Sequence, residues 1–99
     1  MNLYLLSQNK VGGYDTYDST VVAAKSPKDA RQIHPSEFVT HITDGKWMGT
    51  YSGGEKINEE YENEMDSWVK YKDIDCIKVE FLGPTIKKRG VILASFNAG

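Results

Sequence analysis

The segment STVVAAKSPKD, residues 19–29, decides the fold, because it passes from a strand directly into a capped helix. Its first seven residues, most of them β-branched or small, predict a strand. Ser26 suits a helix N-cap, and Pro27 suits the first helical position because its missing N–H needs no partner there. Asp29 stands three residues after the cap, where it can complete a capping box. We therefore expect a helix over residues 26–34, ended by the proline that follows.

Another strand precedes this segment. Residues 2–7 are mostly apolar and are bounded by turn-forming residues, which predicts a short strand. Residues 8–18 contain Gly12 and Gly13 and are too many for a two-residue hairpin turn. We therefore expect two antiparallel strands that are joined by a long, shaped loop.

The C-terminal third predicts two further strands. Ile77, Val79 and Phe81 alternate along residues 75–82, which is the period of a half-buried strand. Residues 90–96 are apolar on both faces, which is typical of an interior strand. Because only a short, basic turn separates the two segments, we expect them to pair as a hairpin with Phe81 in the core.

The middle of the chain gives weaker signals. Residues 46–51 carry Trp47 and indicate a strand, although glycines interrupt it. Residues 55–68 place apolar residues at helical spacing among acidic ones, which predicts a helix, and the alternative is an ordered acidic loop. The expected fold class is therefore α+β: a small, mostly antiparallel sheet of four to five strands, in the order ββα, an irregular or helical middle, then ββ, with one or two helices.

Length and composition predict a single domain over residues 1–99. The chain is 39% hydrophobic and 26% charged, which is typical of a globular domain of this size. Cys76 is the only cysteine, so no disulfide can form within the chain. The N-terminus lacks the pattern of a secretory leader, and no apolar run is long enough to span a bilayer. We therefore expect a soluble protein of the cytoplasm that binds no membrane.

The sequence carries no signature of an enzyme. The paired glycines lack the context of a phosphate-binding loop, and His34 and His41 do not have the spacing of metal ligands. We expect His34 to close the C-terminus of the helix, where positive charge is favourable. The basic turn at residues 87–89 has no interleaved aromatic residues, so direct binding of nucleic acid is not expected. These patterns predict a non-catalytic protein with no metal and no cofactor.

The first long loop has the composition of a ligand site. Tyr14, Asp15, Tyr17 and Asp18 combine aromatic faces with carboxylates, which suits a flat ligand that carries hydrogen-bond donors. Asn97 ends the last strand and can donate and accept at once. The alternative is that the loop only folds on itself, with its aspartates in Asx-type turns. If a small ligand binds, we expect these five residues to line its site. We also expect a homo-oligomer, because so small a domain has little concavity of its own.

Charge is unevenly distributed along the chain. Residues 55–66 hold six acidic residues and one lysine, a local balance of −5, whereas the whole chain carries −2. Such a surface favours fast, salt-sensitive association with a basic partner, and the alternative is a solvated face without a partner. The residues expected to meet a partner are Glu59, Glu60, Glu62 and Glu64.

Four patterns together carry a resemblance to a known family: an N-terminal LYLL, YDTYDS at residues 14–19, VVAAKS before a helix that ends in His-Pro, and GVILASFNAG at residues 90–99. They resemble small proteins encoded by tailed phages and prophages, over residues 1–36 and 75–99. The acidic middle, residues 40–70, has no counterpart in this resemblance.

The resemblance implies a context and no catalytic residues. Small accessory phage proteins are often directed at host defence in the host cytoplasm, and two non-catalytic routes follow. One is the binding and sequestration of a nucleotide-like immune signal, which the Tyr-Asp loop favours. The other is the inhibition of a host defence protein with a basic surface, for example a CRISPR-type nuclease complex, which the acidic segment 55–66 favours.

Overall fold

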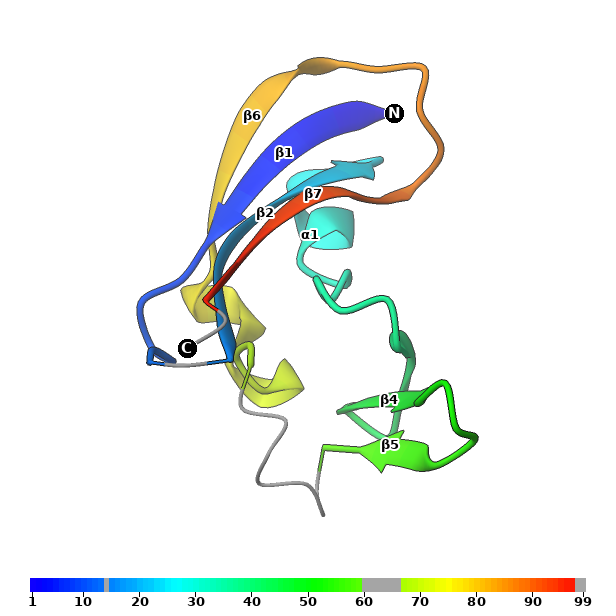
Figure 1. Ribbon diagram of the computed structural model, residues 1–99. Coiled ribbons are helices and arrows are strands. Elements are labelled where there is room, and N and C mark those ends of the chain that lie inside the picture. The colour runs from blue at the N-terminus through cyan, green and yellow to red at the C-terminus, as the bar shows by residue number, and fades with distance from the viewer. Residues whose placement is uncertain (14, 60–66, 98–99) are drawn as a thin grey trace.

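The computed structural model describes residues 1–13, 15–59 and 67–97, which form two antiparallel β-sheets with short helical segments (Figure 1). The larger sheet has the strand order β6-β1-β2-β7, and the smaller sheet has the order β3-β4-β5. The α+β class with mainly antiparallel sheets is confirmed, whereas the expected single sheet of four to five strands is wrong. The elements in chain order are β1 (Asn2–Ser7), β2 (Thr16–Ala24), α1 (Pro27–Ala30), β3 (Val39–Thr43), β4 (Lys46–Thr50), β5 (Lys56–Asn58), the 3₁₀ helix η2 (Tyr71–Cys76), β6 (Lys78–Pro84) and β7 (Gly90–Asn97).

Strands β1 and β2 form the centre of the larger sheet, and their expected antiparallel pairing is confirmed. Their register places Tyr4 opposite Val22 and Leu6 opposite Thr20, and all four side chains are buried. Because successive side chains of a strand point to opposite faces, these four residues form one row that faces the core. Leu5 lies on the other face and is only half-buried.

Helix α1 begins as the sequence predicts and ends earlier. The Ser26 hydroxyl accepts the backbone N–H of Asp29 at 3.1 Å, and the Asp29 carboxylate accepts the backbone N–H of Lys25 at 3.0 Å. This reciprocal arrangement satisfies N–H groups that a helix start leaves without partners. The helix ends at Ala30 and not near residue 34. Leaving the helix early allows Ile33, which is 7% exposed, to enter the core.

The smaller sheet occupies the part of the chain for which an irregular or helical middle was expected. Strand β4 carries Trp47 and confirms the strand that residues 46–51 indicate. It turns back on β3 through Asp44 and Gly45, which both adopt positive φ, as a two-residue type I′ turn requires. At Gly49 the backbone approaches the Phe38 carbonyl oxygen so closely that no Cβ would fit.

The expected helix over residues 55–68 is contradicted where it can be compared. Lys56–Asn58 forms strand β5, which pairs with β4. Ile57 and Trp68, two of the apolar residues at helical spacing, are buried as expected. The other two, Tyr61 and Met65, lie outside the described residues. Local periodicity is therefore misleading here, because a strand and a later buried residue supply the same spacing as a helix.

One cluster of buried side chains joins the two sheets. It combines residues of β1 and β2 with residues of α1, the smaller sheet and the segment that leads into η2. Each large apolar side chain that is fully buried contributes about 1.5–3 kcal/mol to folding. The largest members with almost no exposed area are Trp68, Leu6, Ile57, Ile77, Val22 and Val69. The two sheets are therefore held together by a shared core.

The two C-terminal strands form where the sequence predicts them, and their expected pairing is wrong. Strand β6 pairs with β1, and β7 pairs with β2, so they lie at opposite edges of the larger sheet. Residues 85–89 cross the end of the sheet, where the Thr85 N–H donates to the Met1 carbonyl oxygen at 3.1 Å (Figure 1). The β1–β2 pair already forms the centre, so each later strand adds to one of its two free edges.

The sequence predicts Phe81 in the core, and this prediction is wrong. It is 60% exposed, and its ring meets Tyr4 edge-on with the centroids 5.9 Å apart. The β1–β6 ladder shifts register between Leu3 and Tyr4. Strand β6 is an edge strand, so Phe81 has a neighbouring strand on one side only. The alternation of apolar residues therefore predicts its face of the sheet but not its burial.

Candidate functional site

The end of β7 meets the start of β2, and this contact brings together four of the five residues that the sequence predicts for a ligand site. The backbone N–H of Asp15 donates to the Asn97 carbonyl oxygen, and the Asn97 amide donates to the Asp18 carboxylate at 3.1 and 3.2 Å. Tyr17 lies opposite Phe96 in the β2–β7 register. Tyr14 lies outside the described residues. Their proximity follows from the strand pairing, and their function in binding stays a prediction.

The Tyr-Asp loop is held in shape by Gln8. Its side-chain amide donates to the carbonyl oxygens of Val11 and Tyr17, both at 2.8 Å, and its side-chain oxygen accepts the Val11 N–H at 2.8 Å. Asp15 adopts a positive φ of 59°, a conformation that Asp tolerates better than most residues. Gln8 thus fixes the described parts of the loop beside the start of β2.

Tyr17 connects this rim to the segment that follows α1. Its ring lies 4.7 Å from the ring of Phe96. Partial burial raises the pKa of the Tyr17 phenol, a hydrogen bond with the Ser36 side chain lowers it in part, and the negative charge of Glu37 raises it further. The phenol therefore lies close to Ser36 and Glu37, although these residues are distant from it in the sequence.

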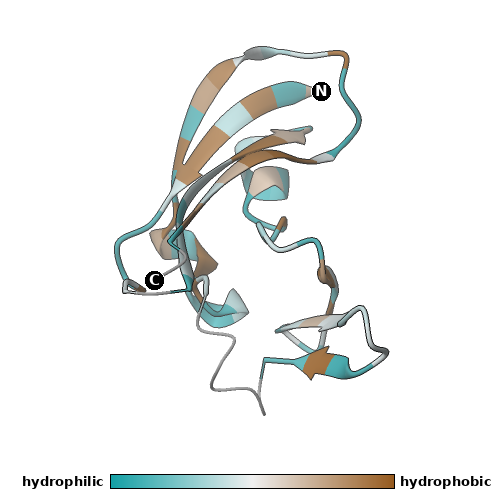
Figure 2. Cartoon of the chain, in the orientation of Figure 1, coloured by the Kyte–Doolittle hydropathy of each residue, from teal (hydrophilic) through white to brown (hydrophobic). Residues whose placement is uncertain are grey.

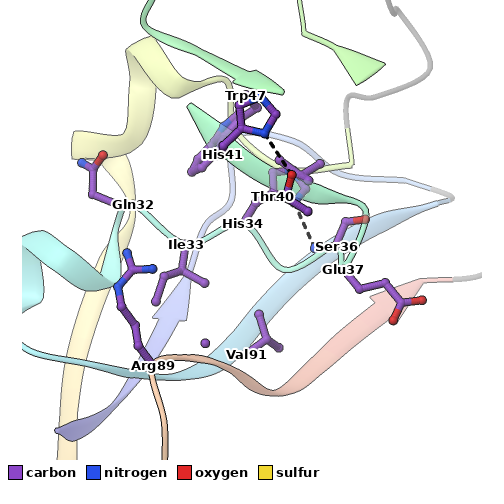
Figure 3. A pocket seen from close by; sticks show the side chains of 12 residues that line it. Gln32, Ile33, His34, Ser36, Glu37, Thr40, His41, Trp47, Arg89 and Val91 are labelled. Atoms are coloured by element: carbon purple, nitrogen blue, oxygen red, sulfur yellow. Dashed lines mark hydrogen bonds between the residues drawn. The ribbon is translucent and has the colours of Figure 1, made fainter. Parts of the chain in front are cut away.

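Ser36 and Glu37 also line a cleft between the segment after α1 and the start of β7 (Figure 3). Its cavity volume is about 320 Å³, which lies at the lower end of small-ligand sites. Trp47 reaches it from β4, and Arg89 and Val91 form the opposite side. The remaining lining residues are Gln32, Ile33, His34, Val39, Thr40, His41 and Gly90.

His34 lies at the inner side of this cleft. It is 5% exposed, and its Nδ1 accepts the backbone N–H of Ser36 at 2.9 Å. Its ring meets the Trp47 ring edge-on, with the centroids 5.2 Å apart. Burial lowers the pKa of His34 to about 3, so the imidazole is neutral at physiological pH. The expectation that a charged His34 closes the helix is therefore wrong: the side chain is buried four residues after α1 ends.

Trp47 is fixed from several directions. Its indole N–H donates to the Val69 carbonyl oxygen at 3.0 Å, and its ring meets Tyr71 edge-on at 5.4 Å. The Glu59 carboxylate accepts the backbone N–H of Trp47 at 3.0 Å and that of Tyr71 at 2.8 Å. Glu59, one of the residues predicted to meet a basic partner, thus holds β4 and η2 together. Glu60, Glu62 and Glu64 lie outside the described residues.

Arg89 places a positive charge at the side of the cleft. Its guanidinium contacts the Asp29 carboxylate at 3.0 Å, and their side chains are 42% and 23% exposed. Partial burial opposes a low pKa for Asp29, but hydrogen bonds from the Lys25 N–H and from Arg89 lower its pKa overall. The residue that caps α1 therefore also positions the arginine. A guanidinium holds five N–H donors, so this pairing leaves it able to contact an anion.

A second hollow of about 370 Å³ lies beside the acidic segment. It is lined by Gly45, Lys46, Glu59, Lys70 and Lys72. Three lysines therefore lie around Glu59, the acidic residue in this lining.

Sequence patterns did not identify the cleft. Its two sides, residues 32–41 and 89–91, are distant in the sequence and meet only because β7 pairs with β2. The composition of the first loop and the end of the last strand indicate only the rim of the sheet.

In the described ranges no group of three His, Cys, Asp or Glu side chains is placed to hold a metal ion. Over the same residues, no helix has the length and apolar character needed to cross a membrane. Comparisons with protein-family models, with curated proteins and with solved structures found no match to this chain.

Proposed function

We propose that this chain binds a small, nucleotide-like anion in the cleft between the segment after α1 and β7, and sequesters it without chemical change. The observation that carries the proposal is the cleft, in which apolar and aromatic groups adjoin the Arg89 guanidinium. Ligand sites of small molecules are lined mainly by apolar and aromatic groups, with few polar groups that fix orientation. A base or sugar suits the apolar side, and a phosphate suits the arginine.

Polar groups along the cleft supply hydrogen-bond partners of both kinds. Gln32 donates and accepts, whereas the Glu37 carboxylate only accepts. The neutral imidazole of His34 adds no charge, and among the lining residues Arg89 carries a positive charge and Glu37 a negative one. Tyr17 interacts with Ser36 and Glu37, which line the cleft. One of the predicted ligand residues is thus a neighbour of the cleft.

The biological setting of the proposal comes from the terminal segments. Their resemblance to small phage proteins favours a host immune signal of nucleotide type as the ligand, bound in the host cytoplasm. The alternative, inhibition of a basic host defence protein through residues 55–66, depends mainly on residues outside the described ranges. The inward role of Glu59 reduces the number of carboxylates available to such a partner.

The proposal is tested by titrating the purified chain with a panel of cyclic and linear nucleotides in a calorimeter. A binding nucleotide is then recovered after the protein is denatured and is identified by chromatography and mass spectrometry. Saturable binding with intact recovery supports sequestration. Turnover of the nucleotide, or no binding across the panel, contradicts the proposal.

A further inference from the structure

The outer edge of β7 is the most apolar uncovered feature of the larger sheet. Among the described residues, β7 pairs with β2 on one side and with no strand on the other. Four of its side chains are substantially exposed: Val91 by 39%, Ile92 by 39%, Leu93 by 68% and Phe96 by 46%. Strand β7 is one of the strongly apolar strands in Figure 2.

Both faces of the larger sheet contribute to this exposure. Val91 lines the cleft, on the covered face, whereas Leu93 lies opposite Val21 on the outer face. Leu5 and Val21, next to Leu93 in the same row across the sheet, are only half-buried and not exposed. Because side chains on both faces of β7 are exposed, the uncovered feature is the free edge of this strand and not one face of the sheet.

The opposite edge of the same sheet is protected in ways that β7 is not. Strand β6 carries Lys78, Glu80 and Pro84, and charges and proline on an edge strand discourage pairing with another chain. Strand β7, with the sequence GVILASFN, contains no charged residue and no proline. The β2–β7 pairing skips Ile92, because Val21 lies opposite Leu93 and Val22 lies opposite Val91. Residues 93–97 of β7 are then all paired in succession.

The charge-free sequence of β7 favours a second copy of the chain as its partner. When a strand pairs with its own copy about a two-fold axis, each residue near the axis lies beside its own equivalent. Any charge there would meet a like charge, and like charges directly opposite one another destabilise a strand pair. A pairing strand for a charged peptide would instead carry complementary charges.

We propose that two copies join through antiparallel pairing of their β7 edges, so that the two four-stranded sheets become one sheet of eight strands. The pairing satisfies the backbone groups along residues 93–97 and covers Leu93 and Phe96. Antiparallel pairing also directs the Phe96–Asn97 end of the partner subunit toward the Gly90 end, where the cleft lies. The second copy then contributes to the wall of the cleft, a consequence that rests on the proposed function, whereas the dimer itself does not.

The dimer is tested without any ligand, so its failure is distinguishable from a failure of nucleotide binding. Light scattering after gel filtration and sedimentation velocity should give twice the chain mass of 11.1 kDa for the wild type. Leu93→Lys should weaken dimerisation about tenfold or more, because the pairing would cover an unpaired charge in place of an apolar side chain. Leu82→Lys places the same change on β6, where the residue is 49% exposed, and should leave the dimer intact.

A charge exchange at Ser95, which is exposed and near the middle of residues 93–97, guards against a folding defect in the leucine variant. Ser95→Lys and Ser95→Asp should each be monomeric alone and should form a heterodimer when mixed. Circular dichroism confirms that each variant is folded. A monomeric wild type, dimers that survive both Leu93→Lys and the single Ser95 variants, or dimers lost equally in Leu82→Lys would overturn the proposal.

Discussion

Glu59 and Trp47 are joined twice: the Glu59 carboxylate accepts the Trp47 backbone N–H at 3.0 Å, and the Glu59 N–H donates to the Trp47 carbonyl oxygen at 3.1 Å. The second carboxylate oxygen accepts the N–H of Tyr71 at 2.8 Å. One side chain therefore connects the smaller sheet to η2. The cleft depends on this connection, because Trp47 forms one of its sides.

Glu59→Gln should lower the free energy of unfolding by about 1.5–3 kcal/mol, which is typical for a lost hydrogen bond to a charged group. A glutamine amide presents one oxygen and one N–H₂ group, so one of the two backbone N–H groups would face a donor. Urea denaturation measures the effect. Glu55→Gln, an exposed change in the same segment, is the matched control. Equal stability of the two variants would contradict the structural role of Glu59.

Gly49→Ala should be strongly destabilising, by about 3 kcal/mol, because the new methyl group would overlap the Phe38 carbonyl oxygen. The methyl group would be attached directly to the β4 backbone, and the atoms that it meets are backbone atoms of Phe38. Neither can move away as the end of a flexible side chain would. Gly53→Ala is the control, since a Cβ at Gly53 meets nothing within 4 Å. Thermal unfolding of the two variants checks the prediction. A Gly49→Ala chain as stable as Gly53→Ala would show that Gly49 does not approach the Phe38 backbone as described.

Local features of the fold are predictable from the sequence, because short-range physics decides them. The cap at Ser26 depends on a hydroxyl and a carboxylate three residues apart, and the structure forms both hydrogen bonds. The four terminal strands likewise appear close to the expected residues. Each of these features is specified by neighbours in the sequence.

Strand order and the cleft are not predictable in this way. Whether β7 pairs with β6 or with β2 depends on which sheet edges remain free, and neither strand's periodicity encodes that. The same limitation hides the second sheet, because Ile57 occupies a short strand whose spacing to Trp68 is equally helical. The cleft requires residues 32–41 and 89–91 to meet, so it could not be found before the strand order was known.

Stability should fall as the pH decreases below about 6.5, through protonation of His34. Burial lowers the pKa of His34 from its ordinary value of 6.5 to about 3. Between these values the unfolded chain binds a proton that the folded chain does not, so unfolding is favoured as pH falls through this range. The contribution of one such group approaches about 1.4 kcal/mol per pH unit.

The measurement is the free energy of unfolding between pH 7 and pH 5, in the wild type and in two variants. His34→Gln keeps an acceptor for the Ser36 N–H and removes the titration, so its stability should depend less steeply on pH. His41→Gln changes an exposed histidine and should retain the slope of the wild type. If His34→Gln and the wild type show equal slopes, His34 is not buried as a neutral group in solution.

Combined neutralisation of Glu60, Glu62 and Glu64 to Gln should change the free energy of unfolding by less than about 0.5 kcal/mol, as exposed substitutions usually do. The expectation rests on the cost of burying several unpaired charges. The triple variant should associate more slowly with an immobilised polylysine surface, and its binding should depend less on salt. Glu59 is left unchanged because its loss would confuse stability with association. Identical binding across a salt series would reduce the acidic segment to a solvated feature.

Arg89→Gln should weaken binding of the tightest nucleotide in the panel by about tenfold or more, because charge-assisted contacts to phosphate are the strong ones. The matched control is Lys88→Gln, which removes the same charge one residue away from the lining of the cleft. Calorimetric titration of both variants compares the two positions directly. The Asp29–Arg89 pair is partly open to solvent and contributes little to stability, so the Arg89 variant should remain folded. A loss of affinity of equal size in both variants would indicate that the basic turn attracts the nucleotide only through its overall positive charge. A loss confined to Arg89 would place the phosphate at the cleft.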